Sequence, residues 1–490
     1  MLFLITFLFS QKTTDARMVG LNSAYTNLAD GFQCVGINPA NLSVYKKKAL
    51  NVFNLSFGIS TNSLSITNYN VLTGANFEDD TATNYYSKDD FLKFFNNEGL
   101  RVLYSLNVPI PLNISYNNYA FTSSFVTNMD IGIPFGFIDF LLFGNPFNKK
   151  ISTEMRQSIS ISQQMGISYA NTFKNFSAGI TIKYILGLMY MGMEPINNPS
   201  ISTSINGFSG QSQYIIKQAI GGSGLGLDFG IITEESPEGY RYGISIINLL
   251  GKIKWTQDHF MRSQIDDQLK SSLGDFYLRP NEMIYMNMVM DSVTAISFTN
   301  TSGDPLVYYE KYKVIPIDNI DNINMTSIDS SLLITLTNGT YLFPSGGEYV
   351  QSVIMPSNDS TLVLSDNYDS LITGNNNQFV TRQPMYFRFG ISKKWEKDII
   401  LLADLVTGFS DQFNSSSNWK LSIGSEITRF KNNFIRFGYS FGGVAKRSAS
   451  IGYGRKFGAL YLDFGVAFNG GLNLETAKGF DYAFGIKLQI

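Results

Sequence analysis

The stretch FDYAFGIKLQI, residues 480–490, decides the fold. Its apolar residues (Phe480, Tyr482, Phe484, Ile486, Leu488, Ile490) alternate without error with Asp481, Ala483, Gly485, Lys487 and Gln489. A period of two places the two sets on opposite faces of a β-strand. The segment is also about as long as a tilted membrane strand, roughly 9–11 residues.

The same alternation recurs upstream, in segments 460–468, 435–441, 419–427, 385–392, 240–246, 225–231, 176–184, 159–169 and 53–59. A soluble β-sandwich alternates in the same way. Three features favour a membrane barrel. The polar faces are rich in Gly and Ser, the connections alternate between short and long, and aromatic residues stand near strand ends. Those aromatic residues are Tyr169, Tyr184, Trp255, Trp395 and Trp419.

Composition excludes several classes of protein. The 490 residues hold 37 Lys and Arg against 39 Asp and Glu, for a formal net charge of −2. No nucleic-acid partner is expected, because such binding needs a basic face. A content of 44% apolar and 14% aromatic residues is too high for a disordered chain. One Cys and one His exclude an internal disulfide framework, a multi-Cys metal site and a two-His metal site.

No segment has the composition of a membrane-spanning helix, which takes about 20 apolar residues. The longest apolar run, Ile131–Gly144, is interrupted by Pro134, Gly136 and Asp139. A closed barrel is the remaining structure that satisfies its backbone in lipid. The apolar run Met1–Phe9, followed by polar residues, predicts a secretory signal over residues 1–10. Its missing basic region raises the alternative that the true start lies upstream.

The connections predict a topology for the barrel. Turns around residues 170–175, 233–239, 395–397, 429–433 and 457–459 are short and are assigned to the periplasm. Most connections on the other side are longer, at 190–222, 408–418, 442–447 and 469–479, and are assigned to the cell exterior. The strand count from Gln157 onward is odd, and about three more strands between Asn51 and Thr127 give about 14. We expect barrel strands over 49–255 and 384–490.

Residues 256–383 interrupt the series and are rich in Asn, Asp and Ser. By parity they form an extracellular insertion. Because long structureless connections are uncommon, we expect a small β-rich cap or long hairpins. Residues 87–95 predict a short helix with Ser87 as its N-cap, and residues 137–143 predict another.

Three groups of motifs resemble a known family. The N-terminal group is ARMVG (16–20), AYTNLADG (24–31) and NPANL (38–42). The second is GLGLDFG (224–230) with NLLG (248–251) and Trp255, and the third runs from Pro384 onward. Together they resemble the FadL-like superfamily of outer-membrane long-chain fatty-acid transporters. The nearest members are the Bacteroidetes-type barrels that include the type IX secretion shuttle protein. The resemblance implies a barrel of 14 strands, an N-terminal helical plug in its lumen, and the outer membrane of a Gram-negative-type bacterium.

The predicted plug covers residues 11–48. Small residues over Gly20–Ala29 indicate helical character, and Asn38-Pro39-Ala40 marks a turn, because Pro39 biases Asn38 toward extended conformations. Cys34 lies in this segment next to Phe32 and Val35, so we expect a buried and inert thiol.

Charged residues on the polar faces of the strands are the candidate site residues. By alternation they face the lumen: Lys183, Asp228, Arg388, Glu426, Arg436, Asp463, Asp481 and Lys487. The structural interpretation is cross-strand ion pairing within the wall and to the plug. The functional one has Arg388 or Arg436 binding the carboxylate headgroup of an amphipathic ligand. Ile400 and Leu402, also on the lumen side, suit a lipidic ligand better than an ion.

Catalysis and metal binding have little support in the sequence. His259 follows Asp258 without any nucleophile motif, so it is interpreted as a loop residue. Adjacent acids such as Asp79/Asp80 and Asp266/Asp267 lack the spacing of a dedicated Ca²⁺ loop and are interpreted as solvated charge. We therefore predict no enzyme activity, no cofactor and no metal.

The leading functional prediction is passive transport of hydrophobic or amphipathic small molecules such as fatty acids, with plug movement or lateral exit. The alternative is a scaffold or shuttle barrel that binds exported proteins at the cell surface. An outer-membrane lipase comes third. Expected partners are outer-membrane lipid and lipopolysaccharide, with a hydrophobic ligand or a secreted protein according to the function.

Overall fold

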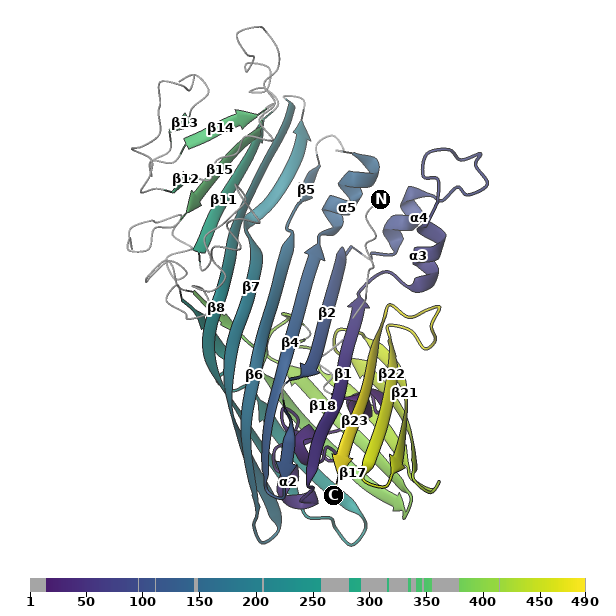
Figure 1. Ribbon diagram of the computed structural model, residues 1–490. Helices are drawn as coiled ribbons and strands as arrows, with labels where there is room; N and C mark the ends of the chain where they lie inside the picture. Colours follow the sequence, from purple (N-terminus) through teal and green to yellow (C-terminus); the bar gives the residue numbers. More distant parts are fainter. Residues whose placement is uncertain are drawn as a thin grey trace.

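The computed structural model describes residues 15–489 (Figure 1), apart from 96, 111, 145–148, 205–206 and 414. Between residues 257 and 378 it describes only the backbone of β11 to β15. The predicted secretory signal and His259 lie outside the described residues.

Among the described residues, 14 antiparallel strands form a closed ring, in which β23 pairs with β1. In ring order they are β1 (Ala49–Thr61), β2 (Leu100–Pro109), β4 (Tyr119–Ile133), β6 (Arg156–Thr172), β7 (Phe176–Ser204), β8 (Gly207–Thr233), β9 (Tyr240–Ile247), β17 (Tyr386–Glu396), β18 (Ile399–Gly408), β19 (Lys420–Ile427), β20 (Asn433–Gly442), β21 (Arg447–Phe457), β22 (Leu460–Asn469) and β23 (Gly479–Gln489). The predicted antiparallel barrel is confirmed, and the sandwich alternative is wrong.

The outer face of the ring is apolar. Ile167, Ile182 and Leu225 expose 67%, 58% and 59% of their surface, whereas their neighbours Ser168, Thr181 and Gly226 belong to the face that points inward. Large apolar side chains around a closed wall require lipid as their solvent. The protein is thus a membrane-embedded β-barrel. No helix of the described residues is long and apolar enough to cross a bilayer.

Trp255 does not belong to an aromatic girdle, contrary to the prediction. Trp395 and Trp419 are 62% and 50% exposed, as a girdle requires, but Trp255 is fully buried. It ends the short strand β10 (Lys252–Trp255), and its indole covers two glycines of the wall. A Cβ at Gly187 would lie 2.6 Å from the indole, and one at Gly222 would lie 2.8 Å from it. A tryptophan near a strand end could not be distinguished from a girdle residue until its glycine partners were known.

The predicted loop over 190–222 is wrong. β7 continues to Ser204 and β8 starts at Gly207, so this hairpin rises well above the rest of the rim (Figure 1). The backbone of β11 (Glu282–Asp291) pairs with β8, and β15 (Glu348–Ile354) pairs with β11. The sequence placed a long connection here, but pairing along both strands extends the hairpin through most of it.

The remaining strands are short and flank the ring or the raised hairpin. They are β3 (Ile114–Tyr116), β5 (Lys150–Ser152), β12 (Ile315–Pro316), β13 (Ile334–Thr335), β14 (Tyr341–Ser345) and β16 (Phe379–Arg382). β16 pairs with β10, and β5 pairs with the upper part of β7. The predicted bounds of the insertion, 256–383, stay a prediction.

Three helices lie at the rim: α3 (Ile66–Leu72) and α4 (Lys88–Lys93), which join β1 to β2, and α5 (Phe135–Phe143), which follows β4. The last two confirm the predicted helices. Ser87 is the N-cap of α4 as predicted, although its side chain makes no capping hydrogen bond.

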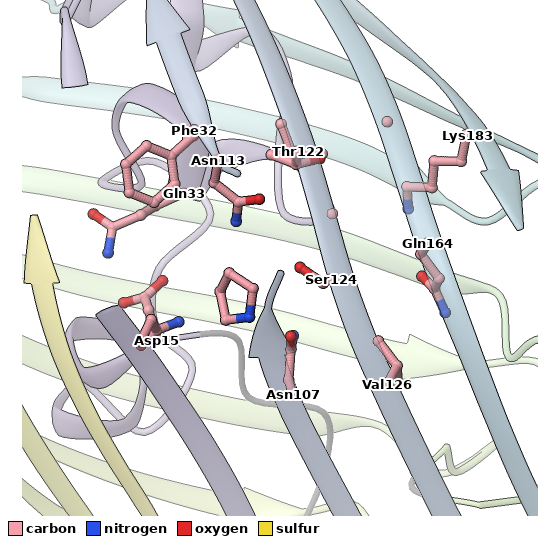
Figure 2. Close-up of a pocket in the computed structure, with 15 residues that line it drawn as sticks. Asp15, Phe32, Gln33, Asn107, Asn113, Thr122, Ser124, Val126, Gln164 and Lys183 are labelled. Atoms are coloured by element: carbon pink, nitrogen blue, oxygen red, sulfur yellow. The ribbon is translucent and has the colours of Figure 1, made fainter. Parts of the chain in front are cut away.

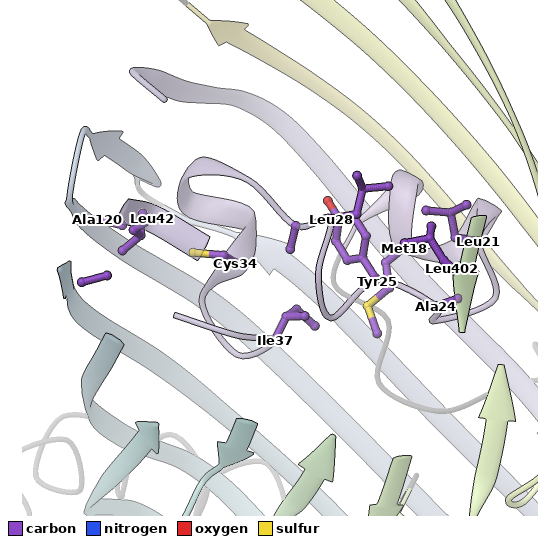
Figure 3. Close-up of a cluster of buried hydrophobic side chains, with 12 residues drawn as sticks. Met18, Leu21, Ala24, Tyr25, Leu28, Cys34, Ile37, Leu42, Ala120 and Leu402 are labelled. Carbon is purple, nitrogen blue, oxygen red and sulfur yellow. The ribbon is translucent and has the colours of Figure 1, made fainter. Parts of the chain in front are cut away.

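The N-terminal segment lies inside the ring as the predicted plug (Figure 3). It contains α1 (Ala16–Gly20), the 3₁₀ helix η1 (Gly31–Cys34) and α2 (Asn41–Tyr45). The helix predicted over Gly20–Ala29 is wrong, because α1 ends at Gly20 and turns follow. Asn22 and Ser23 have φ values of 51° and 72°, which no α-helix accommodates. Cys34 is buried, as expected.

Candidate functional site

Glycines on the inner face of the wall form the surface against which the plug packs, called here the glycine seat. A Cβ at Gly438 would lie 2.4 Å from the carbonyl carbon of Leu21, and one at Gly465 would lie 2.3 Å from the carbonyl oxygen of Ala16. No real Cβ tolerates such distances, so the plug backbone approaches the wall as closely as it does only because these side chains are missing. A Cβ at Gly179, Gly230, Gly243, Gly390 or Gly452 would lie similarly close to plug atoms, at 2.0 to 2.8 Å, and one at Gly424 would lie 3.2 Å from Ala24 and Leu21.

The Asn38-Pro39-Ala40 turn rests on two of these glycines. Asn38 Nδ2 donates to the carbonyl oxygen of Ile231 at 3.2 Å, and Asn38 Oδ1 accepts from the amide of Ala40 at 3.2 Å. Gly230 faces Asn38, and Gly179 faces the peptide between Pro39 and Ala40. The structure therefore gives this motif contacts that fix the plug to β7 and β8.

An alternating chain of charges links the plug to four strands. Glu426 of β19 accepts two hydrogen bonds from Arg17 of α1, at 2.7 and 2.8 Å, and one from Arg436 of β20, at 2.6 Å. Arg436 also donates to Asp463 of β22 at 2.7 Å. At the other end, Arg17 meets Asp30, and Asp30 meets Lys487 of β23, each at 3.2 Å. The three acids and three bases cancel, as buried charge requires.

A second group holds the turn after α1. Asp404 Oδ2 of β18 accepts from the amides of Tyr25 and Thr26, both at 2.8 Å, and from the Thr26 hydroxyl at 2.6 Å. Arg388 of β17 pairs with Asp404 at 3.2 Å and donates to the carbonyl oxygen of Ser23 at 2.9 Å. Asp404 is buried, and this one wall carboxylate organises two consecutive plug amides.

A third group lies on β7 and β8, away from the other two. Lys183 pairs with Asp228 at 2.7 Å and donates to Asn248 Oδ1 at 2.9 Å, and the amide of Asn248 donates to Asp228 Oδ1 at 2.9 Å. Lys183 and Asp228 are buried. The group ties two strands to the turn that leads toward β10.

The six predicted site residues thus all face the lumen, but in three separate groups. Both guanidinium groups considered for headgroup binding, Arg388 and Arg436, already contact carboxylates of the protein. A role of these residues in ligand binding stays a prediction. Sequence reasoning missed Asp404, although the alternation that placed Leu402 in the lumen also places Asp404 there. It also missed Arg17 and Asp30, for which the plug offers no periodic pattern.

The wall is interrupted beside the plug. β1 pairs with β2 from Ser56 to Thr61 and with β3 at Ala49 and Leu50, and β2 ends at Pro109, four residues before Asn113. Proline has no amide hydrogen to continue the ladder. We call this gap in the ladder, beside the described residues Ile110, Leu112 and Asn113, the wall break. Ile110 and Leu112 are 53% and 40% exposed.

A cavity of about 70 Å³ lies between the wall break and the plug (Figure 2). Its plug side comprises Asp15 and residues of η1 and the turn after it. Its wall side comprises side chains of β1, β2, β4, β6 and β7. The residues that line it are Asp15, Phe32, Gln33, Val35, Gly36, Asn54, Asn107, Pro109, Asn113, Thr122, Ser124, Val126, Gln164, Gly166 and Lys183.

A loop crosses one mouth of the lumen, at the end of the barrel where β18 ends and β19 begins. Its described residues, 409–413 and 415–419, are called the strap, and they contact β2 and β4, half the ring away. The amide of Phe413 donates to Asp130 Oδ2 at 2.8 Å, and Arg101 donates to the carbonyl oxygen of Asp411 at 2.9 Å while pairing with Asp130 at 2.7 Å. Phe413 is buried with a φ of 55°, which is rare for a bulky residue. A smaller cavity of about 30 Å³ lies between the strap, the plug and Arg388.

Among the described side chains, no cluster of three or more His, Cys, Asp or Glu residues could hold a metal ion. The described part of the lumen contains hydrogen-bonding groups, buried ion pairs and small cavities.

Comparison with known proteins finds similar solved structures over nearly the whole chain. The CymD monoaromatic hydrocarbon channel is 10% identical, with 98% of this chain and 97% of that chain covered and a TM-score of 0.45. The P. putida toluene transporter TodX is 9% identical, with 98% and 99% covered and a TM-score of 0.46. A Pseudomonas aeruginosa FadL homologue is 12% identical, with 98% and 99% covered and a TM-score of 0.44.

No protein-family model and no curated protein sequence matches the chain. The strand pairing itself, a ring of 14 strands closed around a folded N-terminal segment, gives the chain the fold that its FadL-like motifs implied, whereas the Bacteroidetes subtype stays a prediction.

Proposed function

We propose that the barrel carries hydrophobic or amphipathic small molecules passively through the outer membrane, entering from the extracellular side and leaving sideways through the wall break. The wall break beside a cavity is the observation that carries this proposal. A closed ladder would offer no passage between lumen and bilayer, because each peptide group is paired with the next strand.

The plug supports lateral exit over axial passage. Moving it would separate Arg17 from Glu426, whose side chains are 12% and 3% exposed, and the Thr26 turn from Asp404. Breaking one buried ion pair costs about 3–5 kcal/mol, since the partner charge is left buried. Passage through the wall break requires none of these separations.

Uptake tests the proposal. A host that lacks its own fatty-acid uptake barrel would express the full chain, or a variant without residues 110–113 in which β2 runs directly into β3. We expect accumulation of labelled monodecanoylglycerol, decanoate or toluene with the full chain, and background values for all three with the variant. Heat modifiability on gels would show that both barrels fold. Equal accumulation by both would contradict lateral exit, and background accumulation by both would contradict transport.

The alternative, a shuttle or scaffold that binds exported proteins, is favoured by one observation. The raised hairpin of β7 and β8 provides a wall far taller than a small-molecule route needs (Figure 1). A variant shortened between residues 195 and 214 should then lose a co-purifying secreted protein while keeping uptake. Recovery of the same proteins with the full and shortened barrels would contradict this alternative.

A further inference from the structure

Seven of the fifteen residues that line the cavity beside the wall break have neutral polar side chains (Figure 2). Five of the lining residues carry side-chain amides and two carry hydroxyl groups: Gln33, Asn54, Asn107, Asn113, Gln164, Thr122 and Ser124. A hydrocarbon in this space would remove water from these groups and return no hydrogen bonds, which is unfavourable. The lining therefore offers hydrogen-bonding partners to a polar group, beside the apolar side chains of Phe32, Val35 and Val126.

The charges around the cavity argue against a carboxylate. Lys183 is engaged by Asp228 at 2.7 Å and by Asn248 at 2.9 Å. The other charged lining residue is Asp15, which would repel an anion. The described lining therefore offers no unpaired cation to a fatty-acid headgroup, but does offer several neutral hydrogen-bonding groups.

Asn107 of β2 lines the cavity with a side-chain carbonyl oxygen that could accept a hydrogen bond. Its side chain is only 8% exposed, and its Oδ1 has no hydrogen-bond partner among the described residues. Nearly all buried polar atoms in proteins have a partner, and an unsatisfied one costs about 1–3 kcal/mol. A bound hydroxyl or amide hydrogen would satisfy this atom.

We propose that this cavity binds the uncharged, hydroxyl-bearing headgroup of a single-chain amphipath whose apolar chain lies through the wall break into the bilayer. A volume of about 70 Å³ accepts about five non-hydrogen atoms, at about 10–15 Å³ for each water-sized group. Ile110 and Leu112, exposed at the break, provide an apolar surface for the chain. The proposal rests on the proposed transport function and names its substrate class.

Equilibrium binding to the full-length barrel in nanodiscs tests the proposal. The probes are radiolabelled monodecanoylglycerol, decanoate and decane, which share chain length and differ in headgroup, with empty nanodiscs as the partition blank. We expect saturable binding of monodecanoylglycerol and a tenfold or greater weakening of it in Asn107→Leu. The loss of one hydrogen bond, about 1.4 kcal/mol, corresponds to that factor.

Asn128→Leu is the matched control. Asn128 is a buried asparagine on the lumen side of β4, opposite Ser105 of β2, and does not line the cavity. Its variant should bind monodecanoylglycerol like the wild type. Stronger saturable binding of decanoate or decane than of monodecanoylglycerol would overturn the inference while leaving transport intact. Equal weakening by both variants, or no weakening by Asn107→Leu, would also overturn it. If monodecanoylglycerol binds as expected but the full chain gives only background uptake in cells, the binding site would stand and the transport function would be contradicted.

Discussion

Glu426 is the residue on which the plug's charges converge, since it accepts hydrogen bonds from both Arg17 and Arg436. We predict that Glu426→Gln lowers the free energy of unfolding by about 3–5 kcal/mol, because two guanidinium groups lose a buried counter-charge. Urea unfolding in lipid vesicles would measure the change. Glu396→Gln is the control. The Glu396 side chain, which pairs with Arg429, is 51% exposed, so this pair should contribute less than about 1 kcal/mol. Equal effects of the two substitutions would refute the assigned role.

A substitution at Gly438 tests whether the glycine seat holds the plug in place. A Cβ there would lie 2.4 Å from a backbone atom of Leu21, so Gly438→Ala must displace the plug or the strand, at a cost of about 1–3 kcal/mol. We predict faster cleavage of the plug by added protease in detergent. Gly132→Ala, where the nearest atom would be 3.8 Å away, should leave the cleavage rate unchanged. Unchanged cleavage in Gly438→Ala would mean that the plug is not seated by this contact.

At the residue scale, alternation alone was enough to place the charged wall residues in the lumen. Which of them pair could not be read from the chain, because Arg436 and Asp463 lie on different strands, with another strand between them. Ion-pair partners in the plug, such as Arg17, were even harder to predict, since the plug sequence has no periodic pattern that would indicate which way its side chains point.

At the element scale, the strap depends on a single ion pair of the opposite wall, Arg101 with Asp130. We predict that Asp130→Asn frees the strap, because it weakens both the pair and the contact to the amide of Phe413. A Ser23→Cys reporter in a Cys34→Ser background, below the strap, should then react faster with a charged thiol reagent added outside. Asp139→Asn, in an exposed pair with Lys149, is the control. Equal reaction rates in both variants would show that the strap does not cover the mouth.

Acid should loosen the same strap. Hydrogen bonds from the hydroxyl and amide of Ser417 lower the pKa of Asp411 below its ordinary value of 3.8. A depressed pKa stabilises the closed strap above the ordinary value, and this contribution disappears as the pH falls through the lowered one. The Ser23→Cys reporter, with an acid-tolerant thiol reagent, should therefore react faster only well below pH 4, and Asp411→Asn should abolish this dependence. An acceleration that begins near neutral pH would contradict this origin.

Element types were more predictable than element lengths. The helices α4 and α5 and the barrel strands follow from local patterns, whereas the full extent of β7 and β8 depends on pairing partners far along the chain. The wall break was likewise invisible, since Pro109 identifies an end of β2 but not the neighbour that it fails to meet. Cavities built by several strands have no sequence signature at all.

At the scale of the whole molecule, the wall is electrically balanced without the plug. Among the described residues, the buried charged side chains of the wall are five bases (Lys183, Arg388, Lys420, Arg436, Lys487) and five acids (Asp228, Asp404, Glu426, Asp463, Asp481). Apart from the wall break, neighbouring strands pair all the way round the ring, so the barrel should survive loss of the plug, although several wall charges would then face water instead of protein.

Removal of residues 15–46 from the mature chain is therefore predicted to leave a folded barrel with an open lumen. In planar bilayers we expect a large, steady conductance where the full chain gives little, and only weak preference between cations and anions because the wall charges cancel. Heat modifiability would verify folding of the shortened chain. Strong ion selectivity would contradict the charge balance. A conductance as low as that of the full chain would show that the strap or the wall, rather than the plug, closes the lumen.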